Sequence, residues 1–81
     1  MTMTEMLKAT FERYEILETE DLKRKKHFCA NVFQIDGVGI VFCKIKIAHG
    51  SQTWMHPRFR REWELNGKRI SAANLEKIVG A

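Results

Sequence analysis

The chain contains little proline, little cysteine and no long apolar stretch. Its 81 residues include one proline and five glycines, without a biased or repeated segment, which excludes collagen-like and low-complexity architectures. No stretch approaches the roughly 18 consecutive apolar residues of a membrane-spanning helix. The N-terminus also lacks the basic start and apolar core of a secretory signal. We therefore expect no membrane partner and a cytoplasmic location, or a nuclear one if the source is eukaryotic.

Cysteine and histidine are arranged without a metal or catalytic pattern. Cys29 and Cys43 form no Cys-x-x-Cys pair, and none of the three histidines has zinc-ligand spacing. We interpret both thiols as reduced, buried or half-buried strand residues, and we expect neither a metal nor another cofactor. The chain also shows no nucleophile–base pair and no glycine-rich phosphate loop. An enzyme is therefore not expected.

The N-terminal part of the chain has the pattern of a helix. Thr2 and Glu5 have the spacing of a capping box. Apolar residues then recur at three- and four-residue intervals, which predicts an amphipathic helix over residues 1–17. Residues 18–26 are almost wholly charged and predict a solvated connection.

Strand signals and a second helix follow. Within residues 27–70, strand-like runs are separated by turn residues, a pattern typical of an antiparallel sheet. Ser71 is suited to cap a short helix over 71–80. The apolar fraction of 44% is ordinary for a globular chain. These patterns predict one α+β domain over residues 1–81.

The strongest structural signal is a hairpin in the centre of the chain. Two strand-like runs, 27–35 and 38–47, flank Asp36-Gly37, which is a favoured two-residue turn. The expected register pairs Ile35 with Val38, Phe33 with Ile40, and Asn31 with Phe42. It also places the two cysteines on opposite faces of the sheet.

Three further segments extend this hairpin into a meander of three to four strands. We expect a short strand over 52–56, closed by Pro57, and a longer one over 59–65. Asn66-Gly67 predicts a second tight turn, from which residues 68–70 return.

Both faces of the central hairpin are largely apolar near its turn. One helix covers only one face of a sheet, and an exposed apolar patch of that size is a liability for a monomer. We therefore expect a homodimer in which a second chain covers the other face.

Charge is segregated along the chain. Residues 1–22 hold two basic and six acidic side chains, a net charge of −4, whereas residues 23–81 hold twelve basic and four acidic ones, a net charge of +8. Together they give the +4 of the whole chain. A basic body with tryptophan and phenylalanine among its arginines is what a phosphate backbone attracts.

The first functional hypothesis is a small basic module that binds nucleic acid, single-stranded DNA or RNA in preference to a duplex. Its role would be regulatory or accessory, with basic groups holding phosphates and Trp54 stacking on a base. The candidate residues on the strands and turns are Lys44, Lys46, Trp54, His56, Arg58, Arg60 and Arg61. A basic run preceding the sheet adds Lys23, Arg24, Lys25 and Lys26.

Each of these signals also has a structural interpretation. Arg58 and Arg60 have the spacing to pair with Glu62 and Glu64 along one strand face. The basic run at 23–26 is equally suited to discourage edge-to-edge pairing of the sheet, as lysines do in many proteins.

The alternative hypothesis is a protein–protein interaction module: a small inhibitor, adaptor or subunit. It would use the apolar hairpin over residues 28–47, with Phe33, Ile40 and Phe42 at the interface. The charges would then serve solubility and steering.

Overall fold

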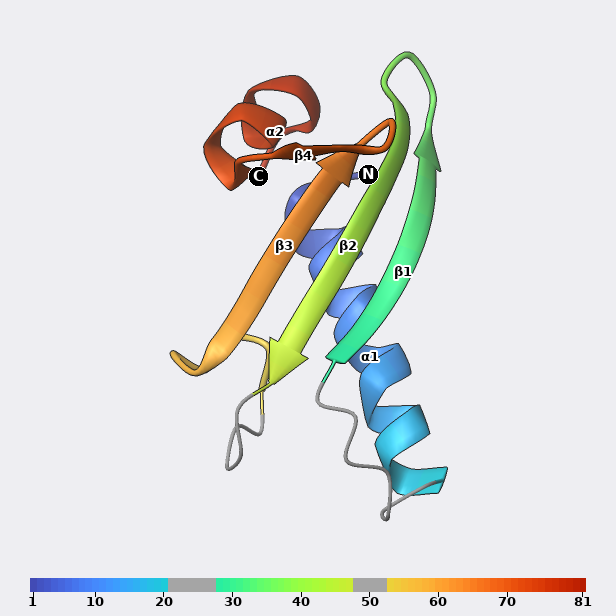
Figure 1. The fold of residues 1–81 in the computed structure, drawn as a ribbon, viewed down its shortest axis with the longest axis vertical. Coiled ribbons are helices and arrows are strands. Elements are labelled where there is room, and N and C mark those ends of the chain that lie inside the picture. The colour runs from blue at the N-terminus through green and yellow to red at the C-terminus, as the bar shows by residue number, and fades with distance from the viewer. Residues whose placement is uncertain (21–27, 48–52) are drawn as a thin grey trace.

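The computed structural model describes residues 1–20, 28–47 and 53–81, and the side chains of these residues except 16–20 and 47. The basic run at 23–26, the expected turn at 49–51 and Gln52 lie outside the described residues. Six elements follow one another (Figure 1): α1 (Met3–Glu20), β1 (Phe28–Ile35), β2 (Gly39–Ile47), β3 (Phe59–Leu65), β4 (Lys68–Ile70) and α2 (Ala72–Val79).

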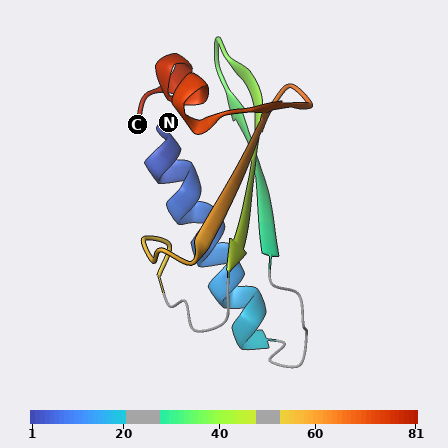
Figure 2. The same cartoon turned by 60° about the vertical axis from the view of Figure 1, so that its left-hand side comes forward.

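The strands form one antiparallel sheet in the order β1-β2-β3-β4. The α+β prediction is therefore confirmed, and the meander has four strands. Both helices lie on the same side of the sheet (Figure 2), and α1 runs diagonally behind it when the open side faces the viewer (Figure 1). No helix among the described residues is long and apolar enough to cross a membrane.

The helix ends follow the capping signals in the sequence. Thr2 and Glu5 form the expected reciprocal box: the Thr2 amide donates to Glu5 Oε1 (3.2 Å), and the Glu5 amide donates to Thr2 Oγ1 (3.3 Å). Ser71 Oγ accepts from the Asn74 amide (3.2 Å) and caps α2. The first helix continues to Glu20, past the expected boundary at residue 17.

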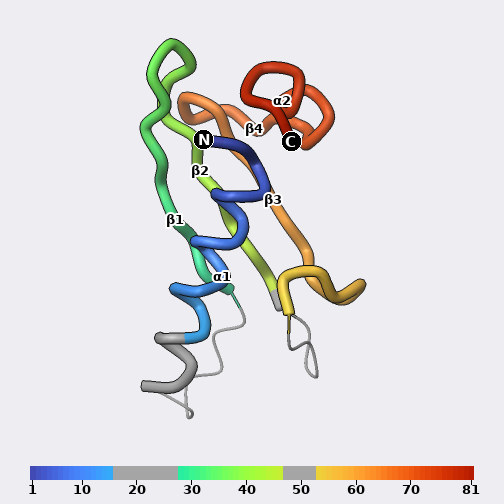
Figure 3. Tube along the Cα trace, turned by 180° about the vertical axis from the view of Figure 1, so that it is seen from behind, coloured from blue at the N-terminus to red at the C-terminus, as the bar shows by residue number. Residues whose placement is uncertain are grey.

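The two termini lie close together and are joined by hydrogen bonds; Figure 3 shows them from the helix side of the sheet. The Met3 amide donates to the Gly80 carbonyl (3.2 Å), and the Thr4 amide donates to the Ala81 carbonyl (3.0 Å). The residues after α2 thereby satisfy two of the amides that a helix leaves without an intrahelical partner at its N-terminus.

The core lies between α1 and the side of the sheet that faces the helices, hereafter the inner face. From α1 it receives Met6, Leu7, Phe11 and Tyr14; from the strands it receives Cys29, Val41, Cys43, Ile45, Phe59 and Trp63; from α2 it receives Leu75. The Phe11 and Phe59 rings meet at 5.5 Å between centroids. Both cysteines are buried and free, as expected for strand residues of this kind.

The expected hairpin register is wrong by one residue. The turn at Asp36-Gly37 does form, with the Val38 amide donating to the Ile35 carbonyl (3.1 Å), but the ladder pairs Ile35 with Gly39 rather than with Val38. Val38 is therefore an additional loop residue. A shift of one residue turns the side chains of one strand to the other face, so Cys29 and Cys43 share the inner face instead of lying on opposite faces.

Burial explains the observed register. It directs Val41, Cys43 and Ile45 to the inner face, where each is 0% exposed. The expected register would have directed Phe42 and Lys44 to the side occupied by Cys29, and a buried ammonium group without a partner is costly.

Gly39 accommodates the extra loop residue. Its φ of +124° is accessible to glycine and rarely to other residues. A Cβ at this position would overlap the side-chain oxygen of Asn66, which accepts a hydrogen bond from the Ile40 amide (2.9 Å).

The expected strand over 52–56 does not form in residues 53–56, which are the part of this segment that the structure describes. Residues 53–58 form consecutive turns, in which the His56 amide donates to the Thr53 carbonyl (2.9 Å) and the Phe59 amide donates to the His56 carbonyl (3.0 Å). Pro57 lies within these turns, where its missing amide hydrogen costs no ladder hydrogen bond.

Cys43 provides a test of the core. Burial raises the pKa of its thiol from 9.0 to about 11. A raised pKa in the folded state contributes stability that is complete below pH 9 and is lost as the pH rises through about 11. We expect the difference in melting temperature between the unmodified chain and Cys43→Ala to shrink over this range. A difference that stayed constant up to about pH 11 would contradict the burial of this thiol.

Candidate binding surface on the open face of the sheet

The side of the sheet away from the helices, hereafter the open face, collects alternate residues of every strand. The ladder aligns them in rows: Gln34 with Ile40; Val32 with Phe42, Glu64 and Arg69; Ala30 with Lys44 and Glu62; and Phe28 with Lys46 and Arg60. No described helix crosses this face (Figure 1).

The half of the open face over β1 and β2 is apolar. We call its four larger members, Phe28, Val32, Ile40 and Phe42, the apolar patch. The exposed fractions are 46% for Phe28, 58% for Val32 and 52% for Ile40, and Phe42 is half-buried beside Val32. Contiguous exposed apolar side chains of this kind mark interaction sites in soluble proteins.

The half over β2, β3 and β4 is charged. We call Lys44, Lys46, Arg60, Glu62, Glu64 and Arg69 the charged stripe; its four bases and two acids give two net positive charges. Lys46 Nζ lies 3.2 Å from Glu62 Oε1, and the hydrogen bond and charge of this lysine lower the pKa of the Glu62 carboxyl. Glu62 therefore remains ionised at neutral pH.

The two halves meet where a lysine lies over an aromatic ring. Lys44 Nζ is 4.7 Å from the centroid of the Phe28 ring, which is within cation–π range. The open face thus presents two phenylalanine positions, Phe28 and Phe42, and a cationic group lies over the first of the two rings.

The candidate nucleic-acid residues are divided between different parts of the molecule. Lys44, Lys46 and Arg60 lie together on the open face. Arg61 lies on the inner side of β3, opposite Ile45; its guanidinium donates to the Trp54 carbonyl (3.4 Å) and lies 5.8 Å from the centroid of the Phe59 ring.

The other candidates at the start of β3 belong to the turns. Trp54 is half-buried and packs against the core, so its ring is not on the open face. The Arg58 amide donates to His56 Nδ1 (3.2 Å) within the turn. The run at 23–26 lies outside the described residues.

The candidate protein-interface residues are divided as well. Ile40 and Phe42 lie on the open face, whereas Phe33 pairs with Val41 and packs against the core. The sequence interpretation did not include Phe28 and Val32 in the surface, because the incorrect register separated them from Ile40 and Phe42. The signal that could have revealed them is the glycine at position 39, which is typical of a bulged turn.

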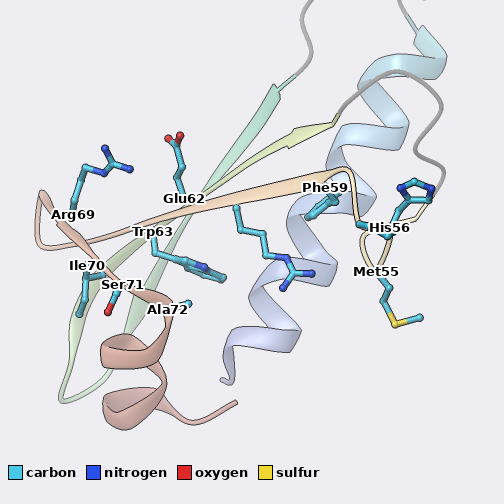
Figure 4. Close-up of a pocket in the computed structure, with 11 residues that line it drawn as sticks. Met55, His56, Phe59, Glu62, Trp63, Arg69, Ile70, Ser71 and Ala72 are labelled. Atoms are coloured by element: carbon cyan, nitrogen blue, oxygen red, sulfur yellow. The ribbon is translucent and has the colours of Figure 1, made fainter.

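A hollow lies at the β4 edge of the sheet, where β4 pairs with only the last three residues of β3. It encloses about 540 Å³ and is lined by Phe59, Trp63, Arg61, Arg69 and the start of α2, among others (Figure 4). The Trp63 indole N–H, at the base of this region, is buried and has no hydrogen-bond partner. Among the described residues, no three His, Cys, Asp or Glu side chains cluster in a way that could hold a metal ion.

Comparisons with protein-family models, with curated proteins and with solved structures each gave no significant match.

Neighbouring residues at the edge of the apolar patch provide a test of the register. Ile40→Glu places a carboxylate at a half-exposed position, and we expect a cost within about 1 kcal/mol. Val41→Glu buries the same group at a position that is 0% exposed, at a cost of several kcal/mol, and should unfold a domain of this size. Circular dichroism and thermal unfolding measure both. Equal losses in the two variants would contradict the observed register.

Proposed function

We propose that this protein binds single-stranded nucleic acid, DNA or RNA, on the open face of its sheet, in a regulatory or accessory role. One observation carries the proposal: Phe28 and Phe42 are on the same uncovered face as Lys44, Lys46, Arg60 and Arg69. The proposal moves the stacking role from Trp54 to these two phenylalanines.

The physical basis is the combination of rings and cations on one surface. Unpaired bases stack on exposed aromatic side chains, each stack contributing about 1–3 kcal/mol. Cationic groups neutralise phosphates and release condensed counterions, which adds affinity without regard to sequence. A duplex hides its base faces, so stacking favours a single strand.

The spacing of the rings suits an extended strand. Phe28 is opposite Lys46 on β2, and Phe42 is four residues earlier on that strand, so the two positions are separated by about 14 Å along it. A backbone that follows the charged stripe can therefore place non-adjacent bases on the two rings.

The acids of the charged stripe are compatible with this ligand. Glu62 is neutralised by Lys46, which leaves Lys44, Arg60 and Arg69 to act on phosphates. Glu64 lies between Phe42 and Arg69 in its row. A carboxylate there can accept a hydrogen bond from the amino group of a stacked base.

A protein partner is the second candidate, and the aliphatic half of the apolar patch favours it. Val32 and Ile40 are each more than half exposed, yet neither can stack on a base. An apolar centre with a charged rim is the usual anatomy of a protein interface. Under this alternative the charged stripe steers the encounter and the apolar patch supplies the contact.

The test of nucleic-acid binding is an anisotropy titration of labelled single-stranded oligonucleotides at low and physiological salt. Phe42→Leu keeps an apolar side chain but removes the ring, and we expect affinity to fall roughly 5- to 150-fold, equivalent to 1–3 kcal/mol. Phe42→Tyr keeps the ring and should bind as the unmodified chain does. If Phe42→Leu bound equally well, stacking at this position would be refuted.

Arg60 and Arg61 form a matched pair for the electrostatic part of the test. They are adjacent in the chain and their side chains lie on opposite faces. Arg60→Gln should weaken binding and reduce the slope of log affinity against log salt by about 0.7, whereas Arg61→Gln should leave both unchanged. Absence of binding at low salt would instead favour the protein partner.

A further inference from the structure

The strand β1 forms an edge of the sheet, and its own eight residues include none of the usual features that prevent pairing. It is eight residues long, Phe-Cys-Ala-Asn-Val-Phe-Gln-Ile, with no charged residue and no proline. Edge strands in natural proteins are commonly short, bulged, or marked by lysine or proline. The opposite edge, β4, follows that rule, because it has three residues and two of them are Lys68 and Arg69.

One hydrogen bond identifies which backbone groups of β1 point outward. The Val32 amide donates to the side chain of its neighbour, Asn31 Oδ1 (3.0 Å), so this amide is not directed at β2. Backbone groups alternate in direction along an antiparallel strand. The groups of Ala30 and Gln34 therefore point outward with those of Val32. Along this edge, within the described residues, neither the Ala30 N–H nor the Gln34 N–H donates a hydrogen bond.

We propose that β1 pairs antiparallel with β1 of a second copy of this chain, about a two-fold axis, to form a continuous eight-stranded sheet. A two-fold axis makes the contact self-complementary, because each outward N–H of one strand meets an outward C=O of the other. The pairing satisfies the outward amides of Ala30 and Gln34. The Val32 amide, which donates to Asn31 Oδ1 in the single chain, would donate instead to a carbonyl of the partner strand.

The distribution of charge favours a second copy at this edge. Each chain carries a net charge of +4, so two copies repel unless they meet through an uncharged surface. The charged stripe lies over β2, β3 and β4, and β1 itself carries no charge, although Lys44 reaches from β2 over the Phe28 ring. Two copies joined through β1 therefore keep Arg60 and Arg69 toward the two ends of the combined sheet, and the two uncharged β1 strands separate the β2 lysines of one copy from those of the other.

The apolar patch adjoins the same edge. Phe28 and Val32 are residues of β1, and both are about half exposed in the single chain. With the axis at Val32, the outward residues Ala30 and Gln34 pair across the two strands, and the Val32 side chain lies beside its counterpart as a cross-strand neighbour at about 5 Å between Cβ atoms. The two patches then merge, which covers part of the surface that a monomer leaves exposed.

A proline at an outward position tests this pairing. Ala30→Pro removes an amide hydrogen that β2 does not use, so the chain can keep its own ladder but cannot accept the second strand. The matched control, Ala30→Ser, keeps the amide. Light scattering coupled to gel filtration should give twice the chain mass of 9.5 kDa for the unmodified chain and for Ala30→Ser, and the single-chain mass for Ala30→Pro.

Amide hydrogen exchange gives a second measurement that does not depend on a variant folding. In the pair, the amides of Ala30 and Gln34 should be protected at high protein concentration and lose that protection on dilution. The amides of Asn31 and Phe33, which point toward β2, should remain protected throughout. A mass of 9.5 kDa at every concentration, a dimeric and folded Ala30→Pro, or a dimer with unprotected Ala30 and Gln34 amides would each overturn the proposal. None of these outcomes depends on whether the open face binds nucleic acid.

Discussion

The packing of α1 against the inner face of the sheet is the contact on which the rest of the structure depends. Met6 and Phe11 on the helix meet Val41, Ile45 and Phe59 on the strands, and all are buried. Full burial of such side chains contributes about 1.5–3 kcal/mol each toward offsetting the conformational entropy cost of folding. Because both helices pack on this side, no described helix covers the opposite face of the sheet.

That asymmetry produces the candidate site. Each strand must direct its most apolar alternate residues toward α1, so the residues between them emerge together on the open face. On β2 these are Ile40, Phe42, Lys44 and Lys46, and the pairing with β1 and β3 brings Phe28 and Arg60 beside them. The packing of α1 against the inner face therefore brings aromatic rings and cationic groups together on the open face. This combination makes the open face suited to a ligand.

The strand pairing also determines what lies at the β1 edge of the sheet. The pairing that leaves β1 at the edge also turns Phe28 and Val32 outward, so unpaired backbone and exposed apolar side chains occur in one place. The termini have the opposite arrangement, since the amides of Met3 and Thr4 are satisfied by the last residues of the chain. Among the described residues, the start of α1 thus has partners for its amides, whereas β1 presents outward backbone groups at an open edge.

The elements of this fold could be predicted from the sequence because their signals are local. Thr2 with Glu5, Ser71, and Asn66-Gly67 each act over a few residues, and each forms the cap or turn that its spacing indicates. The hairpin register and the membership of the open face could not be predicted in this way. They depend on which side of β2 is buried by α1, a contact between residues distant in the chain, and a shift of one residue at Gly39 exchanges the two faces. Arg60 and Arg61 lie on opposite faces because side chains alternate along a strand, and only the tertiary structure decided that the face of Arg60 is the open one.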